Sequence, residues 1–184
     1  MPKPRDTSGN VCCFTLPGTI AGMNVHQKEA AGWIRMGITV DSGAADSVAS
    51  PLSFPGYRVV EHATPQFYQS ATGEPTINLG EQTIAMVTDE GTLRGMKFQA
   101  TKKVKKPLAS VKKIVEANHA VVFAPDALGG SFILNLDTGE VNQMREADGN
   151  YMLDVWVPPA SELQGFGGSH SFRSKGHRTT IDYR

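Results

Sequence analysis

The sequence is poor in cysteine, and this scarcity excludes both a disulfide framework and a cysteine-rich zinc site. Among its 184 residues the only cysteines are Cys12 and Cys13. Adjacent residues have Cα atoms roughly 3.8 Å apart, closer than disulfide geometry normally allows. We therefore expect two free thiols and a reducing compartment. The absence of a second cysteine pair also argues against bound zinc.

Long apolar runs and net charge are lacking as well. No stretch approaches the roughly 18 apolar residues of a membrane-spanning helix, and residues 1–10 lack the apolar centre of a secretory signal. We therefore expect a soluble, cytoplasmic protein that does not bind membranes. Lys+Arg 18 balances Asp+Glu 18, so no overall charge field indicates a nucleic-acid partner.

One local cluster departs from this balance, because residues 101–113 contain six lysines and no acid. The cluster is either a surface that contacts RNA backbone without reading bases, or a solvated face that protects a sheet edge. Its members are Lys102, Lys103, Lys105, Lys106, Lys112 and Lys113.

Glycine and proline are frequent, with 19 and 11 residues, and they separate short β-prone runs. Such spacing is typical of antiparallel hairpins and predicts a mostly β fold. One main helix is predicted over residues 107–118, with Pro107 in its first position. A hairpin is predicted over residues 131–144. Single strands are predicted at residues 36–40, 57–60, 66–69, 120–125 and 151–157.

The stretch MGITVDSGAADSV carries the strongest chemical signal. Its β-prone run ends at Asp41, which is followed by the small residues Ser42, Gly43 and Ala44. Asp-Ser-Gly is ordinary turn chemistry, but the longer pattern also suits a loop that holds a catalytic carboxylate. There the strand fixes the acid, the serine hydroxyl secures the loop, and glycine permits a sharp turn.

Peptide hydrolysis by such an acid requires a second carboxylate beside the same water, and the two share a proton. Asp137-Thr138-Gly139 is followed by Glu140 where a small residue is needed, so we predict an ordinary turn there. Asp46 is either a second acid in the cleft or, as the surface bias of aspartate favours, a solvated loop acid or cap. A homodimer supplies the second acid most simply, because a two-fold axis brings two copies of Asp41 together.

The motifs resemble a known family. WIRMGITVDSGAADSV resembles the active-site segment of retropepsins, and SATGEPTINLGEQTI resembles their flap hairpin. The order of PLASV, VVF, TGE and YMLD is similar to the segment after the protease in copia-type retrotransposon polyproteins. The resemblance covers about residues 33–157, and the acid loop is its most specific part. It departs in having Ala109 and Ser110 before the helix, and in lacking an integrase-like His/Cys set after Val157.

The resemblance implies a retropepsin-like, closed or barrel-like β domain with a flap hairpin and one main helix, extended by a C-terminal β hairpin. The chain then divides into four segments. These are a flexible leader (1–10), a protease domain (11–118), a β extension (119–157) and a Gly/Ser/basic tail (158–184).

The implied activity is that of a dimeric aspartic endopeptidase that cleaves an extended peptide, the element's own polyprotein, without any cofactor. Asp41 is the expected catalytic acid, and the expected optimum is mildly acidic because one carboxyl of the pair must hold a proton. Ser42 would lock the two loops together, and Gly43 and Ala44 would line the substrate backbone. The residues expected near the flap tip are Ala71, Thr72 and Gly73.

Two other functions are compatible with the same sequence. The fold could be a non-catalytic module that grips extended peptides, although a pure binder has no need for Asp41 followed by Ser-Gly-Ala. The lysine cluster could instead serve a Gag-like RNA-binding protein, whose binding would depend on salt and not on Asp41.

Overall fold

The computed structural model describes residues 22–64, 66–69 and 73–164. The predicted leader (1–10) and the flap-tip residues Ala71 and Thr72 lie outside the described residues, as does the tail beyond Gln164. No helix in the described ranges is long and apolar enough to span a membrane.

The described chain is mostly β, as the sequence predicts. Its helices are short: α2 (Val25–Ala30), α3 (Val111–Glu116) and α4 (Ala160–Gln164), with 3-10 turns η1 (Pro51–Ser53) and η2 (Asp126–Leu128). The strands are β1 (Ile34–Asp41), β2 (Val48–Ala49), β3 (Gln66–Gln69), β4 (Pro75–Asn78), β5 (Gly80–Thr88), β6 (Leu93–Ala100), β7 (Leu108–Ser110), β8 (His119–Val122), β9 (Ser131–Asn135), β10 (Val141–Ala147) and β11 (Asn150–Val157).

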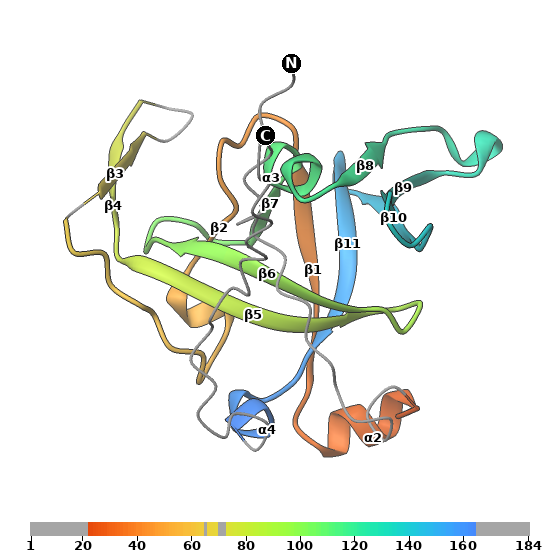
Figure 1. The fold of residues 1–184 in the computed structure, drawn as a ribbon, viewed down its shortest axis with the longest axis horizontal. Coiled ribbons are helices and arrows are strands. Elements are labelled where there is room, and N and C mark those ends of the chain that lie inside the picture. Colours follow the sequence, from red (N-terminus) through yellow and green to blue (C-terminus); the bar gives the residue numbers. More distant parts are fainter. Residues whose placement is uncertain (1–21, 65, 70–72, 165–184) are drawn as a thin grey trace, which may run out of the picture.

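One nine-stranded sheet dominates the fold, in the order β1-β7-β2-β6-β5-β11-β10-β9-β8. Strand β1 also pairs antiparallel with β11, from Ile34 opposite Val157 to Val40 opposite Tyr151. This extra pairing closes the first six strands of that order into a ring, while β10, β9 and β8 leave it as an arm (Figure 1). Strand β11, from the predicted β extension, is thus a neighbour of the strand that carries Asp41.

The core lies inside this ring and fixes the strand that ends at Asp41. Ile38 and Val40 point inward from β1 and are 0% and 5% exposed. The rings of Phe54 and Phe98 pack against each other with centroids 5.1 Å apart. Burial of each such side chain contributes about 1.5–3 kcal/mol, so β1 has little freedom to shift. The same buried cluster includes Ala49, Ile84, Met86, Ala109, Ile114, Leu153 and Val155.

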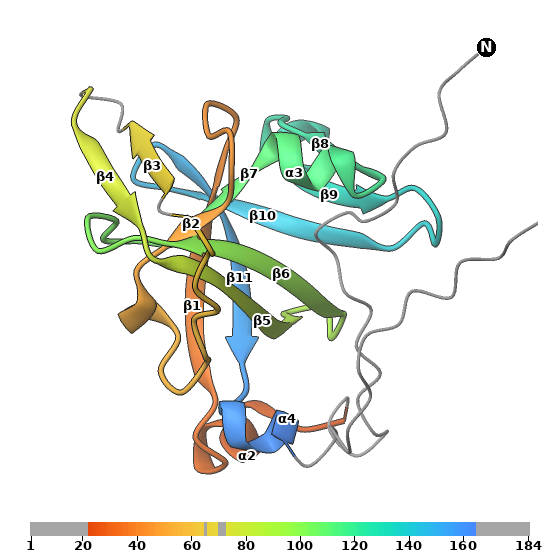
Figure 2. The same ribbon diagram turned by 60° about the vertical axis from the view of Figure 1, so that its left-hand side comes forward.

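A separate two-stranded hairpin, β3–β4, stands to one side of the ring, and the β8–β10 arm stands on the other (Figures 1 and 2). Phe67 pairs with Ile77 across the hairpin, and Tyr68 pairs with Thr76. The connection between the strands spans residues 70–74, the segment that the sequence predicts at a flap tip. The predicted strand at residues 66–69 is therefore confirmed as one side of this hairpin.

The predicted main helix over 107–118 is wrong in its first half. Leu108, Ala109 and Ser110 form β7, which pairs with β1 and β2, and only Val111–Glu116 is helical. The backbone of Leu108 to Ser110 forms hydrogen bonds to two neighbouring strands instead of forming a helical turn. Tertiary pairing therefore overrides the local helix preference. The resulting helix has six residues and is no longer than α2.

The predicted strand at residues 57–60 is also wrong. Of these residues only Val60 pairs its backbone with a neighbouring strand, in an isolated bridge with Glu81. That bridge brings two backbones unusually close at Gly80, whose φ is +131°. A Cβ atom on Gly80 would lie 2.2 Å from the carbonyl oxygen of Val60, so no larger residue fits without backbone movement.

Gly80→Ala should destabilise the fold more than Gly91→Ala, a matched substitution at another positive φ. Gly91 has φ +82° and no atom within 4 Å of its virtual Cβ, so its substitution costs only backbone strain, about 1–2 kcal/mol. Gly80→Ala adds a backbone clash, and we expect a loss of at least about 3 kcal/mol in all. Urea unfolding of both variants measures the difference, and equal losses would contradict the close approach.

Candidate active site

Asp41 is the last residue of β1 and lies where that strand runs parallel to β7. It pairs with Ser110, in register with Thr39 opposite Leu108. Its Oδ1 atom accepts a hydrogen bond from the backbone N–H of Gly43 at 2.7 Å. A Cβ atom on Gly43 would lie 3.4 Å from that same oxygen, an ordinary contact distance, so the space around the carboxylate does not itself require glycine here. No other described residue bonds to the Asp41 side chain.

The loop that follows Asp41 is clamped by the buried side chain of Ser110. The Ser110 hydroxyl donates to the carbonyl oxygen of Ala44 at 2.6 Å, and the Ser110 backbone N–H donates to Ser47 Oγ at 3.0 Å. The same hydroxyl caps α3 by accepting the N–H of Lys113. One serine therefore ties the acid loop, β7 and the start of α3 together. The PLASV motif contains this serine, but the sequence alone does not reveal its role.

An open pocket of ≈ 300 Å³ lies beside Asp41. One side is formed by the end of β1 and by Ser42, and the other by Phe123 and the β10–β11 turn. The rings of Phe123 and Tyr151 pack with centroids 4.7 Å apart and form an aromatic wall. Asp41 is the only acid among the described residues that line this pocket: Thr39, Val40, Asp41, Ser42, Phe123, Gly149, Asn150 and Tyr151.

Asp46 does not line the pocket beside Asp41, so it is not a second acid in that cleft. It is a half-buried loop acid with two partners. Its Oδ2 atom accepts a hydrogen bond from the Tyr68 hydroxyl at 3.0 Å, and its Oδ1 atom lies 3.4 Å from Lys113 Nζ. It therefore connects the acid loop to strand β3 and to helix α3.

Asp137-Thr138-Gly139 forms the β9–β10 turn, as predicted. Gly139 has φ +76°, and Asn118 donates a hydrogen bond to the Asp137 carboxylate. Thr138 caps its own turn by bonding to Glu140. Asp137 is absent from the pocket at Asp41, so this turn gives no second acid to that site.

The remaining predicted site residues occupy different surroundings. Ser42 and Gly43 are exposed, and Ala44 is half-buried beneath the Ser110 hydroxyl. Gly73 is exposed with φ +81° and precedes β4. The structure thus brings Asp41, Ser42, Gly43 and Ala44 together in one loop and puts Gly73 on the separate hairpin.

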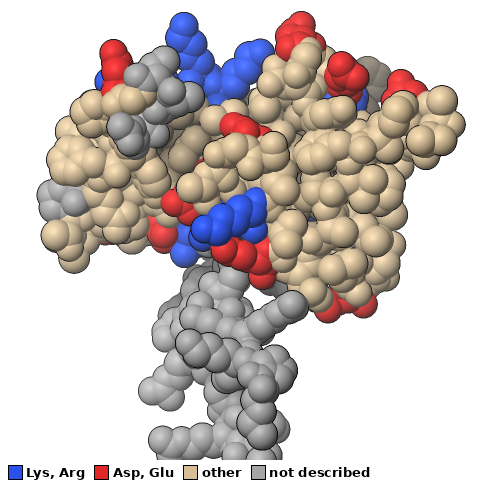
Figure 3. All heavy atoms as spheres, turned by 90° about the horizontal axis from the view of Figure 1, so that it is seen from above, with Lys and Arg blue, Asp and Glu red and all other residues tan. Residues whose placement is uncertain are grey.

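The lysine cluster does not form an uninterrupted basic surface. Lys103 pairs with Glu74 at 3.1 Å, and Lys112 and Lys113 both lie within 4 Å of Glu116. Figure 3 shows acidic and basic side chains interspersed on the face seen from above, most of which is uncharged. This mixture favours the interpretation of the cluster as a solvated surface. Contact with RNA stays a prediction.

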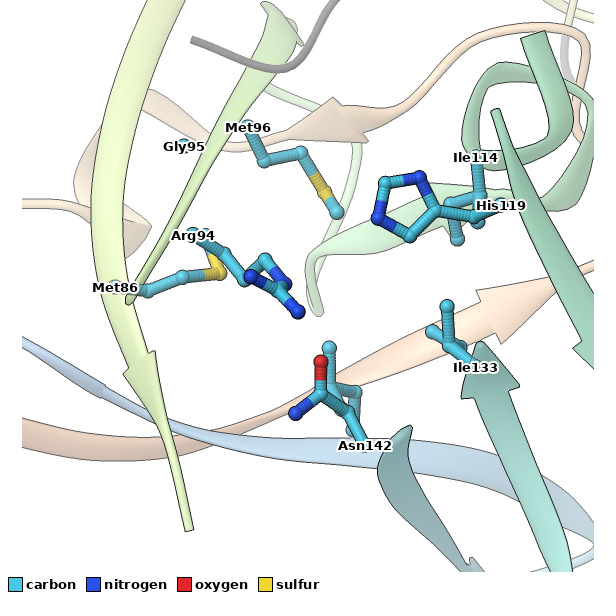
Figure 4. A pocket seen from close by; sticks show the side chains of 9 residues that line it. Met86, Arg94, Gly95, Met96, Ile114, His119, Ile133 and Asn142 are labelled. Atoms are coloured by element: carbon cyan, nitrogen blue, oxygen red, sulfur yellow. The ribbon is translucent and has the colours of Figure 1, made fainter. Parts of the chain in front are cut away.

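A second, smaller cavity lies between the ring and the arm (Figure 4). Its volume is ≈ 40 Å³, enough for a few water molecules at about 10–15 Å³ each. His119 points into it and is held by a hydrogen bond between Nδ1 and the carbonyl oxygen of Ala117. Asp41 does not line this cavity, whose walls are mainly apolar: Met86, Met96, Ile114, Ile133 and Leu153.

No group of three or more His, Cys, Asp or Glu residues in the described ranges is arranged to hold a metal ion. Comparison with known proteins gave no match: no family model, no curated protein and no solved structure is significantly similar to this chain. The functional argument therefore depends on the geometry around Asp41.

Ser110→Ala should destabilise the protein by about 2–4 kcal/mol, because it removes a helix cap and leaves the carbonyl of half-buried Ala44 without its donor. Ser50→Ala is a matched control, since Ser50 caps η1 through its side chain without touching the acid loop. We expect that control to cost about 1 kcal/mol or less. Urea unfolding tests both values, and similar losses would show that Ser110 is only an ordinary cap.

Proposed function

We propose that this chain is an aspartic endopeptidase of the retropepsin type, active as a homodimer. The observation that carries the proposal is the position of Asp41. It is a carboxylate at the end of a strand fixed on both sides, bonded by Gly43 N–H, at the rim of an open pocket. An acid that served only as a turn residue would not need so rigid a platform beside a cavity.

The need for a homodimer follows from the pocket. Hydrolysis by paired carboxylates needs two acids around one water. Among the described residues that line the pocket, Asp41 is the single acid. A two-fold axis close to Asp41 would supply the second acid from an identical loop. The exposure of Ser42 and Gly43 is consistent with such a contact, because these residues are the first that an approaching copy would meet.

In the proposed reaction, one Asp41 carboxylate removes a proton from water while the protonated partner carboxyl donates its proton to the substrate carbonyl oxygen. The water oxygen bonds to the carbonyl carbon and gives a tetrahedral diol. As the C–N bond of this diol breaks, the leaving nitrogen takes the proton of the carboxyl that deprotonated the water, and one diol hydroxyl returns its proton to the other carboxylate. The products are a carboxylic acid and an amine, and the pair again shares one proton.

The substrate in this proposal is an extended polypeptide. The β3–β4 hairpin and the β8–β10 arm stand on opposite sides of the end of β1, and an extended chain can add backbone hydrogen bonds between such elements (Figures 1 and 2). The aromatic wall formed by Phe123 and Tyr151 offers an apolar contact for a side chain next to the scissile bond. The sequence resemblance points to a retroelement polyprotein as the natural substrate.

Asp41→Asn should abolish cleavage of a mixed peptide library near pH 5, with a loss of at least about 10³-fold, because the amide cannot exchange the proton. Asp137→Asn is a matched control: it changes an aspartate with the same Asp-x-Gly setting in the β9–β10 turn. We expect it to retain activity within about two-fold, since Asp137 is absent from the pocket. Mass spectrometry of the products measures both effects.

Three outcomes separate the proposal from its alternatives. No cleavage by a wild-type protein that ultracentrifugation shows to be dimeric would reject the enzyme. Peptide binding that survives in such a dimer would instead identify a scaffold module. Salt-dependent RNA binding that Asp41→Asn leaves unchanged, and that Lys102, Lys105 and Lys106 to Gln abolishes, would identify an RNA-binding protein.

The cleavage rate should depend on pH with a maximum at mildly acidic pH and should fall on either side. Only the pair that holds a single proton is active, so gain of a second proton and loss of the first both stop the reaction. The two inflections belong to the pair and not to either carboxyl. A stopped assay with one peptide from pH 3 to pH 8 measures the profile, and a rate that keeps rising above neutral pH would contradict the shared proton.

A further inference from the structure

Asp46 is the point at which three separate elements meet. It belongs to the loop that begins at Asp41, its Oδ2 atom bonds to Tyr68 of β3, and its Oδ1 atom faces Lys113 of α3. The acid loop is itself tied to β7 by Ser110. A carboxylate five residues after Asp41 therefore links the acid loop to the hairpin beside it.

The orientation of the hairpin explains why Tyr68 reaches this carboxylate. Side chains alternate between the two faces of a strand, so Tyr68 and its cross-strand partner Thr76 share a face. That face turns toward the ring, because Thr76 Oγ1 lies 2.8 Å from Thr101 Oγ1. Phe67 and Ile77 occupy the opposite face and are 66% and 56% exposed.

The polarity of the Tyr68–Asp46 bond is well defined. Burial, with a further contribution from the hydrogen bond to Asp46, raises the pKa of the Tyr68 hydroxyl, so it remains the donor. The hydrogen bond to Glu116 is the main factor that raises the pKa of Lys113, and Asp46 adds to it, so Lys113 keeps its charge. A neutral donor and a cation thus hold one carboxylate between them, and bonds to charged groups are stronger than neutral ones.

The hydrogen bonds between the ring and Thr76 or Asn78 of the hairpin do not involve the acid loop. Thr76 bonds to Thr101, which follows β6, and Asn78 Nδ2 donates to Gln99 Oε1 of β6 at 2.8 Å. These bonds hold the base of the hairpin against the ring. Among the described residues, the Tyr68–Asp46 hydrogen bond is the one that connects the hairpin directly to the loop carrying Asp41.

We propose that Asp46 is a positioning residue that couples the β3–β4 hairpin to the Asp41 loop through Tyr68. With the bond in place, hairpin and loop move as one unit, and release of Tyr68 precedes outward movement of the hairpin. The coupling itself is independent of catalysis. Its consequence for substrate binding rests on the proposed protease function, in which the hairpin covers the bound peptide.

Hydrogen exchange of backbone amides tests the coupling directly on the full chain. Tyr68→Phe removes only the hydroxyl, and we expect about 10-fold faster exchange in β3–β4 together with faster exchange at residues 42–47 of the acid loop. Asp46→Ala should produce at least this pattern, because it also removes the ion pair with Lys113. Adding Tyr68→Phe to Asp46→Ala should change little more, because the bond that they share is already lost. Tyr57→Phe is the matched control: the Tyr57 hydroxyl donates to the Pro158 carbonyl, and its loss should leave both segments unchanged.

The response of the acid loop to a change in the hairpin is the decisive readout. Faster exchange in both segments supports the coupling. Faster exchange in the hairpin alone, unchanged exchange, or an increase spread over the whole molecule would overturn it. Urea unfolding of each variant at the outset identifies any global loss of stability.

Peptide cleavage adds a second readout in an active protein. We expect Tyr68→Phe to raise KM about 10-fold while kcat stays within about two-fold, because the substrate must now order a loosened hairpin. An equal rise in KM in the Tyr57→Phe variant would overturn the proposed role of the Tyr68–Asp46 bond. If the wild type cleaves no peptide, the exchange experiment still decides the coupling, so failure of the protease proposal and failure of this inference are distinguishable.

Discussion

The parallel contact between β1 and β7 is the constraint on which the candidate site depends. Without β7, the end of β1 would lose a neighbour on one edge, and Asp41 would sit on a frayed strand. With β7 in place, Ser110 lies directly opposite Asp41 and can hold the following loop through Ala44 and Ser47. The other edge of β1 is held by β11 as far as Val40, so the strand that ends at Asp41 is fixed on both sides.

The contact between the acid loop and β7 requires hydrogen-bond partners for backbone groups that it buries. A loop pressed against two strands has backbone groups that water cannot reach, and each buried carbonyl or N–H needs a protein partner. The fully buried Ser110 meets this requirement for three backbone groups. Its hydroxyl donates to the Ala44 carbonyl and accepts from the Lys113 N–H, and its own N–H donates to Ser47 Oγ. Alanine in this position would leave the Ala44 carbonyl without its donor.

Local features of the fold were readable from the sequence because they depend on neighbouring residues. The strand before Asp41, the turn at Asp137-Thr138-Gly139 and the hairpin around residues 70–74 all follow from β-prone runs bounded by small or turn-forming residues. The helix prediction was wrong at Leu108 to Ser110 because these residues have adequate helix propensity. They form a strand because β1 and β2 lie beside them, which the local sequence does not reveal. The contacts of Asp46 could not be predicted for the same reason, because its partners Tyr68 and Lys113 are 22 and 67 positions away.

The open pocket beside Asp41 suggests how assembly and chemistry can be linked in the proposed enzyme. In that enzyme a single chain supplies one carboxylate, and the described part of its pocket holds no second acid to complete the acid–base pair. Bringing two copies together would create both the shared proton and the closed cleft in one step. Activity would then depend on protein concentration, and a polyprotein carrying this domain would remain uncut until enough copies had gathered to pair.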